Sequence, residues 1–274
     1  MTQPIKIGLI AGGGQFPLLF AAAAAKKGYQ VHAAAYVNEA SQDIEKYVAS
    51  VEWLFLGQLG RLIRFFKKND ITQVVMMGSV KKTRIFTDIK PDLKAMAFIA
   101  KMRHTHDDSV LRAFAVRLER EGIAIKPSTF LLPELIAPKG CWTKRNPGRA
   151  EKKDIRTGWR MAKEIGRLDI GQCVIVSNGT VLAVEAAEGT DAAIRRGGAL
   201  AESGAVVVKL SKPNQDLRFD LPSSGTQTIK TMQESGASLL VLEAGKTIAF
   251  DREEMVRQAN SHNISIIALD EDGV

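Results

Sequence analysis

The sequence is poor in the side chains on which zinc proteins and many hydrolases depend. Only two of its 274 residues are cysteine and only four are histidine. Cys141 and Cys173 stand alone, so they give neither a disulfide framework nor a zinc motif. The histidines fit neither a Ser/His/Asp or Cys/His catalytic arrangement nor a binuclear metallophosphoesterase pattern. The run His104-Thr-His-Asp-Asp108 has metal-binding chemistry, but no second His-rich segment would supply the remaining ligands.

Long hydrophobic runs and aromatic residues are also scarce. The longest apolar stretch, Leu18 to Ala25, is rich in alanine and too short to span a bilayer. The first residues show no signal peptide, because Lys6 is followed by a short strand-like run and then three glycines. We therefore expect a cytoplasmic protein. Aromatic residues make up 6% of the chain and are not interleaved with basic ones, so the net charge of +8 favours anionic partners without indicating nucleic acid.

The composition indicates a globular α/β protein. With 45% hydrophobic and 25% charged residues, the chain is long enough for one large or two ordinary domains. An apolar run at 5–11, three glycines, a helical pattern to Lys27 and an apolar run at 30–36 predict the β–loop–α–β unit that opens a doubly wound domain. We predict a Rossmann-like domain over 1–138, a basic, turn-rich linker over 139–150 and a second α/β domain over 151–274.

Periodicity and turn residues divide the rest of the chain into helices and strands. Further helices are predicted at 59–68, 91–101, 107–121, 151–165, 190–203, 224–235 and 252–262. Further strands are predicted at 73–77, 123–125, 172–176, 181–184, 205–210, 238–242 and 264–269.

Three glycines after the first predicted strand indicate contact with a nucleotide or another anion. Gly12, Gly13 and Gly14 would let the backbone approach a phosphate at the N-terminus of the next helix. No Gly-Lys-Ser/Thr follows, so this is not a Walker A loop, and Pro17 stands where GxGxxG has its last glycine. A simple tight turn is the alternative. Other predicted ligand-contacting residues of this half, in loops at strand ends or beside helix starts, are Gln15, Gln58, Gly78 and Ser79.

An acidic run joins a predicted strand to the predicted helix at 190–203. Asp191 suits the first turn of that helix, and Thr190 is a plausible N-cap. Glu185 and Glu188 would repel each other in a tight loop unless a cation or an arginine offsets them. The arginine pair at 195–196 would supply that charge, or else forms a solvated face.

A second charged run, from Lys212 to Pro222, has prolines at both ends that argue against a helix. If the segment is extended, Asp216, Arg218 and Asp220 share one face, and apolar side chains share the other. A half-buried strand with a self-neutralising polar face is one interpretation. Phosphate chemistry is the other, because carboxylates hold Mg²⁺ or orient a water while bases neutralise phosphoryl oxygens.

Together these motifs resemble the UDP-2,3-diacylglucosamine pyrophosphatases of the LpxI type over nearly the whole chain. The longest and most specific motifs are Val-Glu-x-x-Glu-Gly-Thr-Asp at 184–191 and Lys-Pro-x-Gln-Asp-x-Arg-x-Asp-Leu-Pro at 212–222. The shorter ones are Gly-Leu-Ile-Ala-Gly-Gly-Gly-Gln-Phe-Pro at 8–17, Leu-Gly-Gln-Leu-Gly at 56–60, Lys-Pro-Asp-Leu-Lys at 90–94, Asp-Asp at 107–108 and Asp-Ile-Gly-Gln at 169–172.

The resemblance implies a Mg²⁺-dependent hydrolase of lipid A synthesis. Such an enzyme splits UDP-2,3-diacylglucosamine into UMP and 2,3-diacylglucosamine 1-phosphate, called lipid X. The resemblance also implies an N-terminal Rossmann-like domain, a C-terminal α/β domain of different topology, and a substrate cleft between them. It implies a cytoplasmic protein that is peripheral at the inner membrane. We expect no nucleic-acid partner and, from the frequency of dimers among enzymes, a homodimer.

Breaking a phosphoanhydride requires neutralised phosphoryl charge and an aligned water. The residues predicted to be catalytic are Asp216, Asp220, Glu185, Glu188, Asp191, Arg218 and Lys212. The predicted metal ligands are Asp216, Asp220 and Glu188. The residues predicted to contact the substrate are Gly12, Gly13, Gly14, Gln15, Gln58, Gly78, Ser79, Thr190, Arg195 and Gln215.

Two other function classes compete with this hypothesis. A nicotinamide-dependent oxidoreductase would use the first β–α–β unit, but the imperfect glycine pattern argues against it. A non-catalytic basic module that binds nucleic acid fits the net charge, but lacks the expected aromatic-basic surface.

Overall fold

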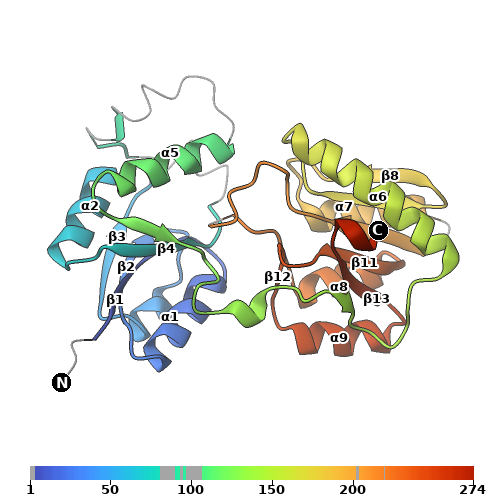
Figure 1. Ribbon diagram of the computed structural model, residues 1–274, viewed down its shortest axis with the longest axis horizontal. Helices are drawn as coiled ribbons and strands as arrows, with labels where there is room; N and C mark the ends of the chain where they lie inside the picture. Colours follow the sequence, from blue (N-terminus) through green and yellow to red (C-terminus); the bar gives the residue numbers. More distant parts are fainter. Residues whose placement is uncertain (1–3, 81–89, 93–94, 97–106, 202–203, 219) are drawn as a thin grey trace. The chain divides into compact units, whose positions relative to one another are not determined.

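The computed structural model describes residues 4–80, 90–92, 95–96, 107–201, 204–218 and 220–274 (Figure 1). The chain forms two compact units. Unit 1 contains Met1–Pro133 together with Asp216–Asp220, and unit 2 contains Glu134–Gln215 and Leu221–Val274. The short segment Asp216–Asp220 therefore belongs with the N-terminal half of the chain, which the sequence did not indicate. Among the described residues, no helix is long and apolar enough to cross a membrane.

Unit 1 is a doubly wound α/β unit around a five-stranded sheet in the order β3-β2-β1-β4-β5. Its strands are all parallel. The three central strands, β2, β1 and β4, are mainly apolar because both faces of a parallel sheet are covered by helices. Ile10, Ala34 and Val74 face a core shared with helices α2 and α5, and α1 lies on the other face (Figure 1). The strands are β1 (Lys6–Ala11), β2 (Gln30–Tyr36), β3 (Ser50–Leu54), β4 (Gln73–Met77) and β5 (Ala124–Lys126), and the helices are α1 (Phe16–Lys26), α2 (Leu59–Lys68) and α5 (Asp107–Glu119).

Unit 2 has a mixed six-stranded sheet in the order β6-β13-β11-β9-β7-β8. Helix α6 covers one face through Ile155 and Trp159, and α7, α8 and α9 cover the other (Figure 1). A separate two-stranded sheet pairs β10 (Ser223–Ser224) with β12 (Ile248–Ala249). The main strands are β6 (Gly140–Cys141), β7 (Cys173–Ser177), β8 (Thr180–Val184), β9 (Ala205–Lys209), β11 (Ala237–Glu243) and β13 (Ser265–Leu269). The helices are α6 (Arg149–Arg167), α7 (Thr190–Leu200), α8 (Thr226–Glu234) and α9 (Arg252–Ser261).

The α/β fold class predicted from the sequence is confirmed, with different strand orders in the two units. The hairpin predicted from Asn178-Gly179 is also confirmed, since β7 and β8 pair antiparallel around it. Asp154 on α6 fixes this turn by accepting hydrogen bonds from both turn amides, at 3.0 Å and 2.6 Å. One carboxylate thereby ties the hairpin to the helix that covers the sheet.

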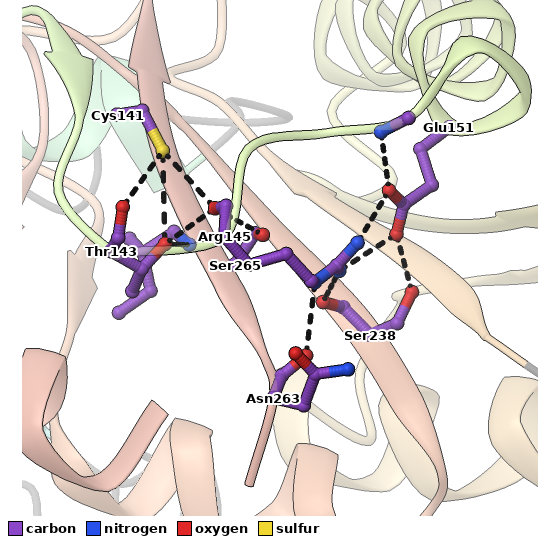
Figure 2. Close-up of polar contacts among 9 residues, drawn as sticks. Cys141, Thr143, Arg145, Glu151, Ser238, Asn263 and Ser265 are labelled. Carbon is purple, nitrogen blue, oxygen red and sulfur yellow. Dashed lines mark hydrogen bonds and ion pairs between the residues drawn. The ribbon is translucent and has the colours of Figure 1, made fainter. Parts of the chain in front are cut away.

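The basic segment 139–150, which was predicted to be a linker, lies within unit 2. Figure 2 shows the polar contacts around Arg145 of this segment. Strand β6 pairs antiparallel with β13. The guanidinium of Arg145 then holds both carboxylate oxygens of Glu151, at 2.8 Å and 2.9 Å, and donates to the carbonyl oxygens of Ser238 and Asn263. The same carboxylate accepts from the amide of Gly148 at 2.8 Å, which completes the start of α6.

The Asp-Arg-Asp run would present alternating faces if extended, but Leu217 and Arg218 lie in a turn. Its amide hydrogen bond from Asp220 to the carbonyl of Asp216, at 3.0 Å, closes a tight loop. The expected N-cap role of Thr190 is also wrong, because Gly189 is the N-cap of α7 and Thr190 lies inside the helix. Most of the predicted helix at 91–101 and the pair His104 and His106 lie outside the described residues.

Candidate active site

The glycine loop lies where the strand order of unit 1 reverses. The chain winds outward from β1 to β3, then returns to place β4 on the other side of β1. Ligands of doubly wound proteins bind at the carboxyl ends of the strands beside such a switch point. The loop after β1 and the loop after β4 meet here through a bridge between Gly13 and Ser79, with N–O distances of 2.7 Å and 3.0 Å. The structure thus brings together Gly12, Gly13, Gly14, Gln15, Gly78 and Ser79.

Glycine is required where these two loops touch. A Cβ atom on Gly12 would lie 2.7 Å from the carbonyl oxygen of Ser79. Gly78 has a φ of +91°, and its Cβ would lie 2.7 Å from the backbone of Gly12. Gly14 differs, because a Cβ there would meet no atom within 4 Å. Gln15 is the N-cap of α1 but gives no side-chain cap. Open backbone before a helix N-terminus is suited to an anion.

Gln58 is not part of this switch point. It follows β3, the edge strand, and its side-chain oxygen accepts from the amide of Phe55 at 2.9 Å. The start of α2 beside it is already capped by Asp92, whose carboxylate accepts from the amides of Gly60 and Arg61 at 2.6 Å and 3.3 Å. The motif at 56–60 and the start of the motif at 90–94 therefore form one loop structure. Its contacts give Gln58 a role in shaping the loop.

Asp216 and Arg218 lie in the short loop that belongs to unit 1. The guanidinium of Arg218 donates from Nε to Oδ1 of Asp216 at 3.0 Å and from Nη2 to Oδ2 at 2.8 Å. Its Nη1 donates to Oε1 of Glu119 at 2.9 Å. The backbone carbonyl of Arg218 accepts from the amide of Ser128 at 2.7 Å. The loop is therefore held by contacts to two segments of unit 1 that lie far from it in the sequence.

The surroundings of Asp216 favour its charged form. Hydrogen bonds from Arg218 lower the pKa of Asp216 against the opposing effect of partial burial, and the charge of Arg112 on α5 lowers it further. Asp216 is thus an ionised acceptor at neutral pH. Such a carboxylate is a weak base, so it is better suited to orienting a water or a cation than to removing a proton.

The acidic run of unit 2 contains one buried and one paired glutamate. Glu185 is 8% exposed, and its Oε1 accepts from the hydroxyl of Thr190 at 2.9 Å. Its Oε2 is buried and has no hydrogen-bond partner among the described residues. Glu188 accepts from Nη2 of Arg196 at 2.6 Å. Both arginines are exposed on α7, and Arg196 is the one that pairs with Glu188 of this run.

Three motif runs of unit 2 meet beside this glutamate. Lys212 donates to Asp169 at 2.6 Å, and the side-chain oxygen of Gln215 accepts from the amide of Lys212 at 3.0 Å. A Cβ on Gly171 would lie only 2.0 Å from the carbonyl oxygen of Glu185. The runs at 169–172, 184–191 and 212–215, separate in the sequence, thus pack against one another. Asp191 lies in the first turn of α7, as expected.

The three predicted metal ligands are divided between the two units. Among the residues that the structure describes, no group of three or more His, Cys, Asp or Glu side chains converges on one point. Asp216 and Asp220 belong to unit 1, and Glu188, paired with Arg196, belongs to unit 2. Mg²⁺ is commonly held by one or two carboxylates together with substrate phosphates and waters. Asp216, whose pKa is lowered so that it stays ionised, has the chemistry of such a carboxylate ligand.

Sequence reasoning missed a buried charged cluster at the carboxyl end of β11. Glu243, with a side chain 2% exposed, accepts from Lys163 and Lys246 at 2.8 Å and from the hydroxyl of Ser211 at 2.7 Å. Burial alone would raise the pKa of Glu243, but these hydrogen bonds outweigh it and lower the pKa. An acid directly after the apolar run 239–242 was the available signal. Glu119 was also missed, and no local pattern distinguishes it from other surface acids.

The fold and these sites define a two-unit α/β protein with a glycine-lined switch point in a doubly wound N-terminal unit. Residues 6–135 match the family model for the LpxI N-terminal domain, and residues 138–267 match that for the LpxI C-terminal domain. The UDP-2,3-diacylglucosamine pyrophosphatase LpxI of Caulobacter vibrioides is 32% identical over 276 residues, which cover 97% of this chain and 98% of that protein. The chain belongs to the LpxI family.

Two solved structures that match are less similar in sequence. The CobK precorrin-6A reductase is 11% identical with a TM-score of 0.34, over 97% of this chain and 88% of that one. The biotin carboxylase domain of the Hydrogenobacter thermophilus 2-oxoglutarate carboxylase is 16% identical with a TM-score of 0.27, over 65% of this chain and 36% of that one. At these TM-scores neither structure supports an argument about this chain.

Proposed function

We propose that the protein hydrolyses UDP-2,3-diacylglucosamine to UMP and 2,3-diacylglucosamine 1-phosphate. Membership of the LpxI family supports this reaction, since the Caulobacter relative is named for it. The observation that links the proposal to particular residues is which segments of the chain make up unit 1. The glycine-lined switch point and the Asp216–Asp220 loop come from opposite halves of the chain, yet both belong to this unit.

In this proposal the switch point binds the nucleotide side of the substrate. The backbone amides of Gly14 and Gln15 and the N-terminus of α1 attract the negative pyrophosphate. Ser79 fixes the loop through its backbone bridge to Gly13. The substrate would then be oriented before reaction, which is where much of the rate enhancement of phosphoryl transfer arises.

Asp216 orients the attacking water, and Asp220 supports it. The water oxygen forms a bond to one phosphorus, the bridging P–O bond breaks, and the water proton passes to solvent or to the departing phosphate. A strong base is not required, because the transition state of phosphoryl transfer is loose. Mg²⁺, held by Asp216 or Asp220 together with pyrophosphate oxygens, would neutralise the charge that develops there. Lys212, Arg218, Arg195, Gln215 and the residues of the 184–191 run remain candidates for steadying the phosphates.

The substrate's acyl chains lead us to propose a cytoplasmic enzyme that is peripheral at the inner membrane. The excess of positive charge, +8, would favour an anionic lipid surface. We also propose a homodimer. The two competing function classes were an oxidoreductase and a nucleic-acid-binding module. The names of the family models and of the Caulobacter relative support neither of them.

The test is to incubate the pure protein with UDP-2,3-diacylglucosamine in detergent and to follow both products by mass spectrometry. We expect UMP and lipid X in equal amounts with Mg²⁺ and much less of both with EDTA. Release of neither product by a folded sample in Mg²⁺ would refute the proposal.

A further inference from the structure

We propose that Glu119 is a positioning residue that holds Asp216 in place through Arg218. The inference rests on the proposed hydrolysis, because it assigns Glu119 to the same loop. Glu119 is the last residue of α5 and lies 99 positions before Arg218 in the sequence. In the part of the chain that the structure describes, its carboxylate contacts Arg218, so we expect its effect on the reaction to pass through that residue.

The guanidinium of Arg218 is fixed from two sides. Nε and Nη2 face the two oxygens of Asp216, and Nη1 faces Oε1 of Glu119 at 2.9 Å. Because the guanidinium is planar and its donors have a fixed geometry, two carboxylates on different edges determine its plane. The contact with Asp216 by itself orients the guanidinium only relative to Asp216. The contact with Glu119 anchors the pair to α5.

The position of Glu119 on α5 supports a role in this contact. Negative charge at the C-terminal end of a helix interacts unfavourably with the helix dipole. An acid at this position is therefore not explained by helix stability, whereas its bond to Arg218 accounts for it. Ala115 and Leu118, in the same turn of α5, are fully buried and give Glu119 a rigid base.

The rest of the loop is also attached to unit 1, which limits what the loss of Glu119 would do. The amide of Ser128 still binds the carbonyl of Arg218 at 2.7 Å, and Asp216 still binds the Arg218 amide at 3.1 Å. Removing Glu119 should therefore loosen the side chains of Arg218 and Asp216 without detaching the loop. Misplacement of a group that orients a reactant lowers kcat more than it raises KM.

The matched control is Glu121, two residues further on. Its carboxylate pairs with Lys67 at 2.5 Å and with Arg117 at 2.6 Å, both within unit 1. Glu121→Ala removes the same charge, and two ion pairs, from the same end of α5. A purely structural effect of Glu119→Ala should therefore be matched or exceeded by Glu121→Ala.

The experiment compares wild type, Glu119→Ala, Glu119→Gln and Glu121→Ala by steady-state kinetics and by hydrogen exchange of the peptide that contains Asp216–Asp220. We expect kcat to fall about 10- to 100-fold in Glu119→Ala with KM changed less than about threefold. Glu119→Gln, which keeps an acceptor oxygen, should recover part of the loss, and Glu121→Ala should match wild type. Exchange of the 216–220 amides should rise only in the Glu119 variants.

Wild-type kcat in Glu119→Ala, or an equal loss in Glu121→Ala, would overturn the inference. A wild-type protein that fails to hydrolyse UDP-2,3-diacylglucosamine would count instead against the proposed function. In that case the exchange measurement still decides whether Glu119 anchors the loop, and unchanged exchange in Glu119→Ala would reject it.

Discussion

Arg218 covers both carboxylate oxygens of Asp216, with Nε 3.0 Å from Oδ1 and Nη2 2.8 Å from Oδ2. This contact joins residues two apart in the sequence, and it forms in a loop that turns back on itself between Asp216 and Asp220. The contact with Arg218 keeps the Asp216 carboxylate charged and fixes its orientation. It also makes that carboxylate a poor base. The relationship explains why both signs of charge recur in the 212–222 run.

Replacing Asp216 with Asn should abolish most turnover while leaving the fold intact. The amide cannot hold a cation or orient a water as the carboxylate does, so we expect kcat to fall by about 10²- to 10³-fold. Asp43→Asn is the control, because the pKa of Asp43 is also lowered, by hydrogen bonding to a nearby base, Lys46, on the surface. Initial rates and thermal melting of the two variants make the comparison. An Asp216→Asn enzyme with activity near that of wild type would contradict the assignment.

Gly78→Ala should weaken nucleotide binding as well as stability. Its φ of +91° is strained for alanine, and the new Cβ would lie 2.7 Å from the backbone of Gly12 and of Gly13. We expect a loss of about 2–4 kcal/mol in unfolding free energy, from strain and displaced backbone. The affinity for UMP, measured by calorimetry, should fall as the switch-point loops separate.

The control for this variant is Gly28→Ala, which isolates backbone strain. Gly28 has a φ of +78°, but a Cβ there would meet no atom within 4 Å. We expect Gly28→Ala to lower the unfolding free energy by about 1 kcal/mol and to leave the affinity for UMP unchanged. If Gly78→Ala bound UMP as tightly as Gly28→Ala, the nucleotide would not sit at the switch point.

Glu151→Gln should destabilise unit 2 at neutral pH by about 2 kcal/mol, because the bidentate contact with Arg145 is charged and only partly exposed. Burial would raise the pKa of Glu151, but hydrogen bonds, chiefly from Arg145, leave that pKa below its usual value. The stability that the charged Glu151 contributes is therefore fully present above its unfolded-state pKa. It is lost as the pH falls through its folded-state pKa.

Urea unfolding at a series of pH values from neutral downward tests this directly. The difference in unfolding free energy between wild type and Glu151→Gln should become smaller in the acid range and should stay unchanged at high pH. Glu164→Gln, in an exposed pair with Arg167, should cost less than about 0.5 kcal/mol throughout. A constant difference between wild type and Glu151→Gln at all pH values would show that charge is not the cause.

The elements with continuous apolar runs could be predicted closely from the sequence. The bounds of β2, β4 and α2 agree with the predicted ranges 30–36, 73–77 and 59–68, because a parallel strand or an amphipathic helix leaves a strong periodic signal. Strand β3, Ser-Val-Glu-Trp-Leu, was missed, since it is an edge strand of mixed polarity. Strand β6 has only two residues and pairs with a strand over 120 positions away, so no local pattern marks it.

The candidate site was less predictable than the fold. The glycine loop and the residues after β4 were found because strand ends in a doubly wound sheet have a known relation to ligands. The turn at Leu217 and Arg218 was not found, because alternation of charge fits a strand as well as a turn. Tertiary contacts determine this conformation. The hydrogen bonds that Ser128 and Glu119 make with Arg218 come from about ninety to a hundred positions earlier in the chain.

The most direct measurement is hydrolysis of UDP-2,3-diacylglucosamine in water labelled with heavy oxygen, with Mg²⁺ and with EDTA, by wild type and Asp216→Asn. Our account predicts Mg²⁺-dependent release of UMP and lipid X by wild type, with the heavy oxygen in one of the two products, and almost no release by Asp216→Asn. Intact substrate after incubation with folded wild-type protein and Mg²⁺, or equal turnover by the two proteins, would contradict it.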